Sequence, residues 1–316
     1  MDYGKLVKRQ NNNIGEAEDR FSELPDSILH YILSFIDTKC AARTCVLSQR
    51  WNHIWHSIPT LVFHYWKSPS LSEINKFMDF LDRTLLLRDA SSNIQKFSLA
   101  THKNMNASRS LFKCESLTKL KLSASRAIHI PKSVSFAKLK SLSLERIQFR
   151  DDCWKEQYFS DCPFLEKLNL EDCTWSSVRK FCIFTSALKV LNIWNQSLEK
   201  DYGLQNCHLK IHAPSMISLT YSGCVAKDYD LSSFPILNTA HVVFDARREH
   251  MNAACTLGDE NEYDEETEGL CQHLESVNFR AFTGERSGMR WEELILKNSM
   301  SLNRMTISYC SFVKSE

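Results

Sequence analysis

Apolar and polar residues follow two different periods along the chain. Between residues 25 and 58, apolar residues recur every three or four positions in three short segments, which start at Pro25, Thr38 and Ser48. Proline is tolerated in the first turn of a helix, and Thr and Ser are good capping residues. The pattern predicts three short helices. Their apolar stripes are wider than the helices can hide from one another, which indicates a module that docks on another protein.

The rest of the chain repeats the phrase Leu-x-x-Leu-x-Leu, often in degraded form. The first five copies lie 22 to 26 residues apart, which is a spacing typical of leucine-rich repeats. Each copy predicts a short strand with alternate residues pointing inward, and neighbouring units must stack because one unit cannot bury its apolar side alone. The copies begin at Ile94, Leu117, Leu139, Leu165, Leu188, Met216, Leu237, Leu274 and Leu302.

An amphipathic helix is the alternative explanation of this repeat. It is disfavoured by the Ser, Thr, Asn and Trp residues between the leucines and by the irregular return segments. Residues 61–66 alternate like a strand and are expected to open the sheet. Residues 72–87 have apolar residues at helical spacing and are expected to cover the open end of the stack.

The amino-terminal segment resembles the F-box. It contains the leading Leu24-Pro25, then Ile-Leu-x-x-Ile-Leu-Ser-x-Ile from Ile28 to Ile36, and the closing Leu-Ser-x-Arg-Trp that ends at Trp51. An F-box binds a substrate receptor to the Skp-type adaptor of a cullin ubiquitin ligase. The resemblance assigns adaptor contact to the following residues, of which the last two support the third helix: Leu24, Pro25, Ile28, Leu29, Leu33, Val46, Leu47, Arg50 and Trp51.

Two positions depart from the F-box pattern, both in the turn between the first and second helices. Ile36-Asp37 stands where the family usually has Leu-Pro, and Cys40 stands where it usually has an acidic residue. The alternative to a docking module is that these residues are only the core of a three-helix cap on the following domain.

The resemblance extends over nearly the whole chain, to plant proteins that join an F-box to leucine-rich repeats. Residues 80–88, 94–97 and 162–173 carry phrases of that group, and residues 274–307 resemble a shortened FBD segment. The implied fold class is α/β, with a three-helix F-box followed by a curved parallel sheet with irregular or helical return segments. The expected domains are a disordered tail at 1–17, the F-box at 18–66, the solenoid at 67–273 with an acidic loop at 258–268, and the last repeats with the FBD-like segment at 274–316.

Residues between the inward leucines of such a sheet point out from its concave face, where partners usually bind. Most of them are small and polar here. Trp194 is the exception, because it is a large apolar residue of the kind that contributes most of the binding energy at interfaces. The alternative is that the loop after Trp194 folds over its ring. We expect an unknown client protein to contact the middle of the solenoid, at Asn169, Glu171, Asn192, Trp194 and Thr220.

The composition argues against some classes of partner. The 316 residues are 43% hydrophobic and carry a formal net charge of +1, so no basic field attracts nucleic acid. The polar amino terminus lacks a signal peptide's apolar core, and no apolar run reaches the roughly 18 to 20 residues of a membrane helix. The twelve cysteines form no Cys-x-x-Cys pair. They are expected to be buried, reduced thiols of a cytoplasmic or nuclear protein that does not bind membranes.

Candidate ligand sites are weak. His208 and His212 lie in a strand-like segment about 13 Å apart, too far for one metal ion. The acidic stretch 258–268 lacks the central glycine of an EF-hand loop. Some plant receptors of similar architecture hold an inositol phosphate, but Lys119, Lys121 and Arg126 are the only dense basic group here. We therefore predict no metal and no cofactor.

No catalytic residues are predicted, because hydrolase-elbow, P-loop and dinucleotide motifs are absent. The sequence predicts a substrate-recognition subunit of a Skp–cullin–F-box ubiquitin ligase. Two alternatives stay open: an interaction scaffold that acts outside a ligase, and a hydrolase-like enzyme whose Cys and His meet only in the fold.

Overall fold

The computed structural model of the chain describes residues 23–65, 71–86, 88, 93–101, 105–106, 111, 114–124, 128–129, 136–149, 157–159, 161–175, 178–195, 204, 207–223, 226, 228–232, 234–244, 276–282 and 304–309. The expected amino-terminal tail and the acidic loop at 258–268 lie outside these residues.

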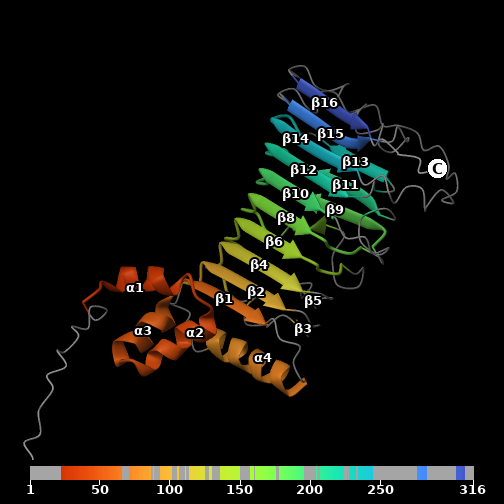
Figure 1. The fold of residues 1–316 in the computed structure, drawn as a ribbon. Helices are drawn as coiled ribbons and strands as arrows, with labels where there is room; N and C mark the ends of the chain where they lie inside the picture. Colours follow the sequence, from red (N-terminus) through yellow and green to blue (C-terminus); the bar gives the residue numbers. More distant parts are fainter. Residues whose placement is uncertain are drawn as a thin grey trace, which may run out of the picture.

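Helices gather at the amino-terminal end of the molecule (Figure 1). They are α1 (Asp26–Leu33), α2 (Thr38–Arg43), the 3-10 turn η1 (Thr44–Val46), α3 (Gln49–Ser57) and α4 (Leu71–Leu86). The first three helices form the predicted three-helix module, and α4 confirms the helix expected at residues 72–87.

Ten parallel strands form one long sheet in the order β1-β2-β4-β6-β8-β10-β12-β14-β15-β16. All nine repeat copies supply a strand, and β1 opens the sheet as predicted. The strands are β1 (Thr60–Tyr65), β2 (Lys96–Thr101), β4 (Lys119–Ala124), β6 (Ser141–Glu145), β8 (Lys167–Glu171), β10 (Val190–Trp194), β12 (Ser218–Gly223), β14 (Thr239–Phe244), β15 (Ser276–Phe282) and β16 (Arg304–Tyr309).

The register of the sheet stacks equivalent repeat positions on one another. Leu142 of β6 pairs with Leu168 of β8, and Leu168 pairs with Leu191 of β10. Because side chains alternate between the two faces of a strand, this register collects the leucines on one side of the sheet. The opposite side carries the residues that the sequence predicts for the concave face, and we call it the outer face. The structure confirms the parallel-sheet solenoid.

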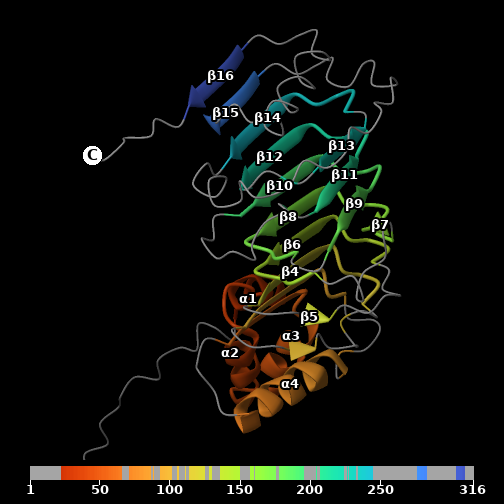
Figure 2. The same ribbon diagram turned by 90° about the vertical axis from the view of Figure 1, so that its right-hand side faces the viewer.

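Where the structure describes the return segments, several of them form strands, and the sequence had predicted irregular or helical segments there. A second parallel sheet runs in the order β13-β11-β9-β7, and Figure 2 shows it beside the long sheet. One of its central strands, β11, alternates apolar and polar residues, as in Leu209-Lys210-Ile211, whereas β9 is apolar from Phe181 to Phe184. A third sheet pairs β3 with β5. These strands are β3 (Met105–Asn106), β5 (Ile128–His129), β7 (Gln157–Tyr158), β9 (Lys180–Phe184), β11 (His208–His212) and β13 (Asp228–Ser232).

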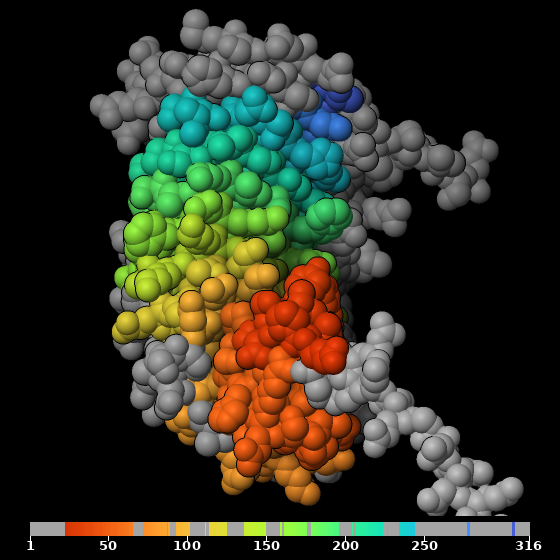
Figure 3. Space-filling model, turned by 90° about the vertical axis from the view of Figure 1, so that its left-hand side faces the viewer, coloured from red at the N-terminus to blue at the C-terminus, as the bar shows by residue number. Residues whose placement is uncertain are grey.

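The helical module lies at one end of the stack of repeats (Figure 3). At the same end of the stack, α4 closes the first layer of the core. Phe63 of β1 makes edge contacts with Phe77 and Phe80 of α4, with ring centroids 6.3 and 6.0 Å apart. Leu81 and Leu85 of α4 are buried in the same cluster. The structure thereby confirms that this helix covers the end of the sheet.

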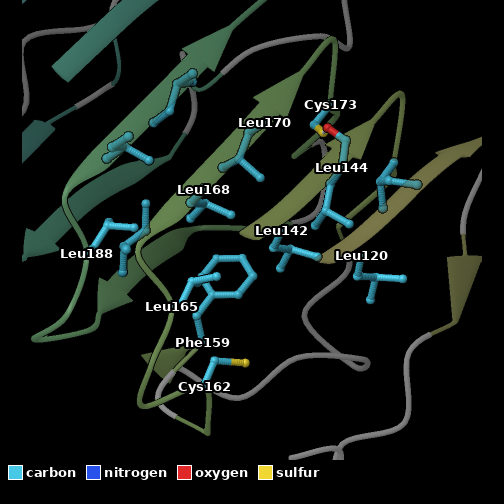
Figure 4. Packing of buried hydrophobic residues seen from close by; sticks show 14 of the residues in the cluster. Leu120, Leu142, Leu144, Phe159, Cys162, Leu165, Leu168, Leu170, Cys173 and Leu188 are labelled. Atoms are coloured by element: carbon cyan, nitrogen blue, oxygen red, sulfur yellow. The ribbon is translucent and has the colours of Figure 1, made fainter. Parts of the chain in front are cut away.

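A continuous core runs between the sheets. Leu142, Leu168 and Leu170 point from neighbouring strands toward Phe159 and Leu165 (Figure 4), and the three strand leucines are almost completely buried. Farther out, the rings of Phe149 and Trp175 stack with centroids 5.3 Å apart. Burying a side chain such as leucine stabilises the fold by roughly 1.5–3 kcal/mol, so each repeat depends on its neighbours for stability.

Candidate docking surfaces

The three-helix module has a small core of its own. Leu29 and Leu33 of α1 are 0% and 3% exposed and pack with Ile54, Trp55 and Ile58. The sequence assigned Leu29 and Leu33 to adaptor contact, but the structure places them between the helices, where they offer no surface to a partner. Helical spacing marked both faces of α1 as apolar and did not tell which one turns inward.

Large apolar side chains cover the outside of the module. Of the twelve exposed large hydrophobic residues in the described part of the chain, seven lie between residues 28 and 47. Tyr31 and Phe35 meet edge to face with ring centroids 4.8 Å apart. Exposed apolar side chains at this density are typical of interaction surfaces. We call these seven residues the module's apolar surface: Ile28, Tyr31, Ile32, Phe35, Ile36, Val46 and Leu47.

Three of the residues predicted for docking belong to this surface, namely Ile28, Val46 and Leu47, and Pro25 is also exposed. The residues predicted for docking did not include Tyr31, Ile32 or the residues after α1. That helix ends at Leu33, so Phe35 and Ile36 project from the following turn. The signal that could have found them was the density of large apolar residues within thirteen consecutive positions, 24–36.

Arg50 fastens the start of α1 to α3. Its Nη2 forms an ion pair with Asp26 Oδ1 at 2.7 Å and also donates to the carbonyl of Leu24. Trp51 is half-buried against the module core, as is Leu24. Ser48 caps α3 by accepting a hydrogen bond from the backbone N–H of Trp51. These side chains hold the helices together, which matches the supporting role expected for Arg50 and Trp51.

The turn that departs from the F-box pattern connects the module to the long sheet. Asp37 caps α2 by accepting the N–H of Lys39 at 2.8 Å, and it also accepts the N–H of His64 at 3.0 Å. The sequence had proposed Thr38 as the cap. Thr38 instead lies inside the helix, and its Oγ1 accepts the N–H of Val62 at 2.8 Å. The carboxylate at position 37 therefore accepts two hydrogen bonds that a proline side chain could not accept.

Arg88 makes a second connection between the module and the repeats. Its guanidinium is buried and donates to the backbone carbonyls of Trp55, at 2.6 Å, and of Ile58. It also lies over the Trp55 ring, 5.3 Å from the centroid. Burial lowers the pKa of Arg88 to about 10. Together with Asp37 and Thr38, Arg88 fixes the module against the solenoid.

The outer face of the long sheet carries the residues predicted for client binding. Asn169 and Glu171 lie on β8, Asn192 and Trp194 on β10, and Thr220 on β12, which are adjacent strands. The register brings these residues together as expected. Trp194 is 47% exposed, between Glu171 and Ser222 on the neighbouring strands. The loop that follows it lies outside the described residues.

Three described outer-face positions are covered, contrary to the expected alternation. Ala100, Ser123 and Ser222, near the carboxyl ends of β2, β4 and β12, are 8%, 2% and 8% exposed. Arg146 Nη2 reaches Ser123 Oγ at 3.1 Å, which explains part of its burial. The usable outer face is therefore narrower than the sequence suggested.

Cysteines and histidines form no metal site in the described part of the chain. Cys173 is fully buried, and its Sγ donates to the carbonyl of Leu144 at 3.5 Å. It lies at the position where leucine-rich repeats place Asn or Cys. Cys40 is exposed, so the expectation of buried cysteines is wrong for that residue. His208 and His212 lie on β11, as the strand pattern predicted.

Among the helices that the structure describes, none is long and apolar enough to cross a membrane.

Comparison with known proteins adds an independent observation. Residues 21–63 match the family model of the F-box domain. Residues 83–211 match a model described as "FBD-associated F-box protein At5g56370, LRR repeats". The first match covers the module and the second covers the repeats from α4 to β11.

Curated relatives come from Arabidopsis thaliana. The putative F-box protein At1g58310 is 28% identical over 283 residues, which cover 73% of this chain and 55% of the relative. The putative F-box/FBD/LRR-repeat protein At3g59240 is 28% identical over 281 residues, 77% of this chain and 55% of the relative. The chain thus spans about half the length of the curated relatives that it matches.

Proposed function

Because the chain is a plant-type F-box and leucine-rich-repeat protein, we propose that it is the substrate-recognition subunit of a Skp–cullin–F-box ubiquitin ligase. Proteins of this kind are generally adaptors and not enzymes, and F-box domains generally bind Skp-type adaptors. In the proposed role the chain performs no chemistry. It brings a client close to the transferring enzymes and acts through proximity, in the cytoplasm or the nucleus.

The module's apolar surface is the observation that carries this proposal. A surface that holds Phe35 at 71% and Val46 at 84% exposure is costly in water and is stabilised when a partner covers it. A Skp-type adaptor is that partner in the proposed function. The alternative of a simple cap on the solenoid explains the buried leucines of α1 but not these exposed residues.

The connections at Asp37, Thr38 and Arg88 support the same function. A ligase subunit has to hold its client at a defined place relative to the adaptor. Asp37 and Thr38 join the module to β1, and Arg88, two residues after α4, joins it to the repeats, so these contacts restrict hinge motion between the two parts. We assign client binding to the outer face of the long sheet, with the F-box at residues 18–66 and the solenoid at 67–273 as the proposed domains.

Adaptor binding is testable by isothermal titration calorimetry with a purified Skp-type adaptor. We expect Val46→Asp with Leu47→Asp to weaken binding by at least a hundredfold, because a charge would be buried in an apolar contact. Both side chains are exposed in the free chain, so the double variant should fold normally. Unchanged affinity in this variant would exclude the module's apolar surface as the adaptor site.

A matched control comes from exposed apolar residues outside the module. Phe164→Asp with Ile236→Asp makes the same chemical change on the solenoid, where these side chains are 57% and 44% exposed. This variant should bind the adaptor normally. Co-purification of a cullin with the adaptor complex then separates a ligase subunit from a scaffold that binds the adaptor alone.

A further inference from the structure

Strands β8 and β10 together form a polar site with opposite charges at its two ends. All of its side chains lie on the outer face, because they alternate with leucine and isoleucine side chains that are at most 1% exposed. Three register pairs make up the site, which we call the β8–β10 site: Lys167 with Val190, Asn169 with Asn192, and Glu171 with Trp194.

Within the part of the chain that the structure describes, the charges at the two ends have no ion-pair partner. Lys167 and Glu171 are both exposed, and neither forms an ion pair with another residue that the structure describes. They lie four residues apart on one strand, a separation of about 13 Å. By contrast, the neighbouring Glu145 is neutralised by Lys121 at 3.6 Å and Arg146 at 2.8 Å. Among the described residues, the β8–β10 site therefore offers one cation and one carboxylate that are not paired with each other or with a neighbour, at a fixed spacing.

The centre of the site offers hydrogen bonds. Asn192 Nδ2 donates to Asn169 Oδ1 at 2.8 Å, which holds both amides in place. That bond leaves the Nδ2 group of Asn169 as a donor and the Oδ1 of Asn192 as an acceptor. A peptide backbone presents the complementary C=O and N–H groups. The asparagine pair is thus suited to hold an extended main chain over the middle of the site.

Trp194 makes the acidic end selective for a cation. Its ring stands beside Glu171 in register and is 47% exposed. A guanidinium or ammonium group can pair with the carboxylate and lie against the indole face at once. An acidic side chain at this end would meet Glu171 and be repelled.

We propose that the β8–β10 site binds an extended client segment that carries Asp or Glu at one position and Arg or Lys about four residues away. The carboxylate lies over Lys167 and the cation lies between Glu171 and Trp194. This inference rests on the proposed function, since it names the chemistry of the client that the outer face accepts.

An array of synthetic ten-residue peptides tests the charge pattern. The peptides carry one Glu and one Arg in a Ser/Gly background, in both orders and at spacings of two, four and seven residues, with Glu/Glu and Arg/Arg peptides for comparison. The probe is the full chain bound to its adaptor. We expect one order at spacing four to bind best, and the like-charge peptides to bind about tenfold more weakly.

Exchanging the two charges within the protein gives the decisive result. Lys167→Glu with Glu171→Lys keeps the net charge and should reverse which order, Glu before Arg or Arg before Glu, is preferred. Lys180→Glu on β9 changes an exposed lysine in the other sheet and should leave the preference unchanged. Equal binding of all peptides, or a preference that survives the double exchange, would overturn the inference.

Failure here and failure of the proposed function give different results. Adaptor affinity is measured on the same samples and does not depend on the charge pattern. If Trp194→Ala weakens peptide binding while the charge exchange has no effect, the outer face binds clients but the charge pairing is wrong. If neither change has any effect, the proposal that this face binds clients is wrong as well. Adaptor docking is tested separately by the calorimetry.

Discussion

The helical module and the long sheet bury their apolar residues to very different extents. In the sheet, Leu168 and Leu191 are completely buried and the face turned to solvent is polar. In the module, only six residues form the buried core, and seven large apolar side chains face outward. A repeat stack covers each unit with its neighbours, whereas three short helices have too few partners of their own. The solenoid buries its apolar residues within the chain, whereas the module leaves an apolar surface that the proposed adaptor would cover.

Thiol reactivity should show the largest difference between the two regions. Cys40 of the module is exposed, while Cys173 of the sheet core is fully buried. We expect iodoacetamide at pH 8 to alkylate Cys40 on the order of a thousandfold faster than Cys173, because Cys173 reacts only after local unfolding. Peptide mass spectrometry over time measures both rates, and the urea-unfolded chain, in which the rates should converge, is the control.

The same thiols predict an effect of alkaline pH. Burial raises the pKa of Cys162 to about 11 and that of Cys173 to about 12. Since the folded pKa lies above the ordinary value of about 9, the unfolded chain loses these protons first. The free energy of unfolding should therefore be unaffected below about pH 9 and should fall as the pH rises toward 11. A Cys173→Ala variant that keeps the same decline would assign it to other groups.

Truncating one side chain in each region should give the next largest difference, which is a difference in the free energy of unfolding. We expect Leu168→Ala to lower the free energy of unfolding by about 2–5 kcal/mol, because it opens a cavity in the sheet core. Ile28→Ala, at a side chain that is 44% exposed, should cost less than about 0.5 kcal/mol in the free chain. Urea denaturation measures both. The order should reverse for adaptor binding, and equal losses of stability would contradict the comparison.

The connection between the regions should show an intermediate effect. Asp37→Ala removes the α2 cap and the acceptor for the N–H of His64, so we expect a loss of about 1–2 kcal/mol. Asp37→Pro restores the usual F-box residue at this position but should be no more stable than Asp37→Ala, because proline accepts neither bond. Full stability of the proline variant would show that the carboxylate is dispensable.

Sequence reasoning succeeded where alternation decides the structure. The phrase Leu-x-x-Leu-x-Leu located all nine repeat strands and placed Trp194 outward, because a strand has only two faces. It did not tell which side of α1 turns inward, because α1 is apolar on two sides and only packing against α3 places Leu29 and Leu33 inside. The sequence marked Asp37 only as a departure from the family pattern. Its structural role was missed because its hydrogen bond to His64 of β1 joins residues far apart in sequence. The second sheet was missed because its strands are short and vary between repeats.

The smallest effect is expected from the ion pairs at the edge of the long sheet. Glu166 lies between Lys140, at 3.9 Å, and Lys189, at 3.3 Å, and all three side chains are more than 40% exposed. Water screens such pairs, so Glu166→Gln should change the free energy of unfolding by less than about 0.5 kcal/mol, and 0.5 M salt should remove the difference. A loss above 1.5 kcal/mol would mean that surface charges stabilise the stack. The expected result would instead show that these ion pairs contribute little to a stack whose core is apolar, so that surface charges can change at little cost to folding.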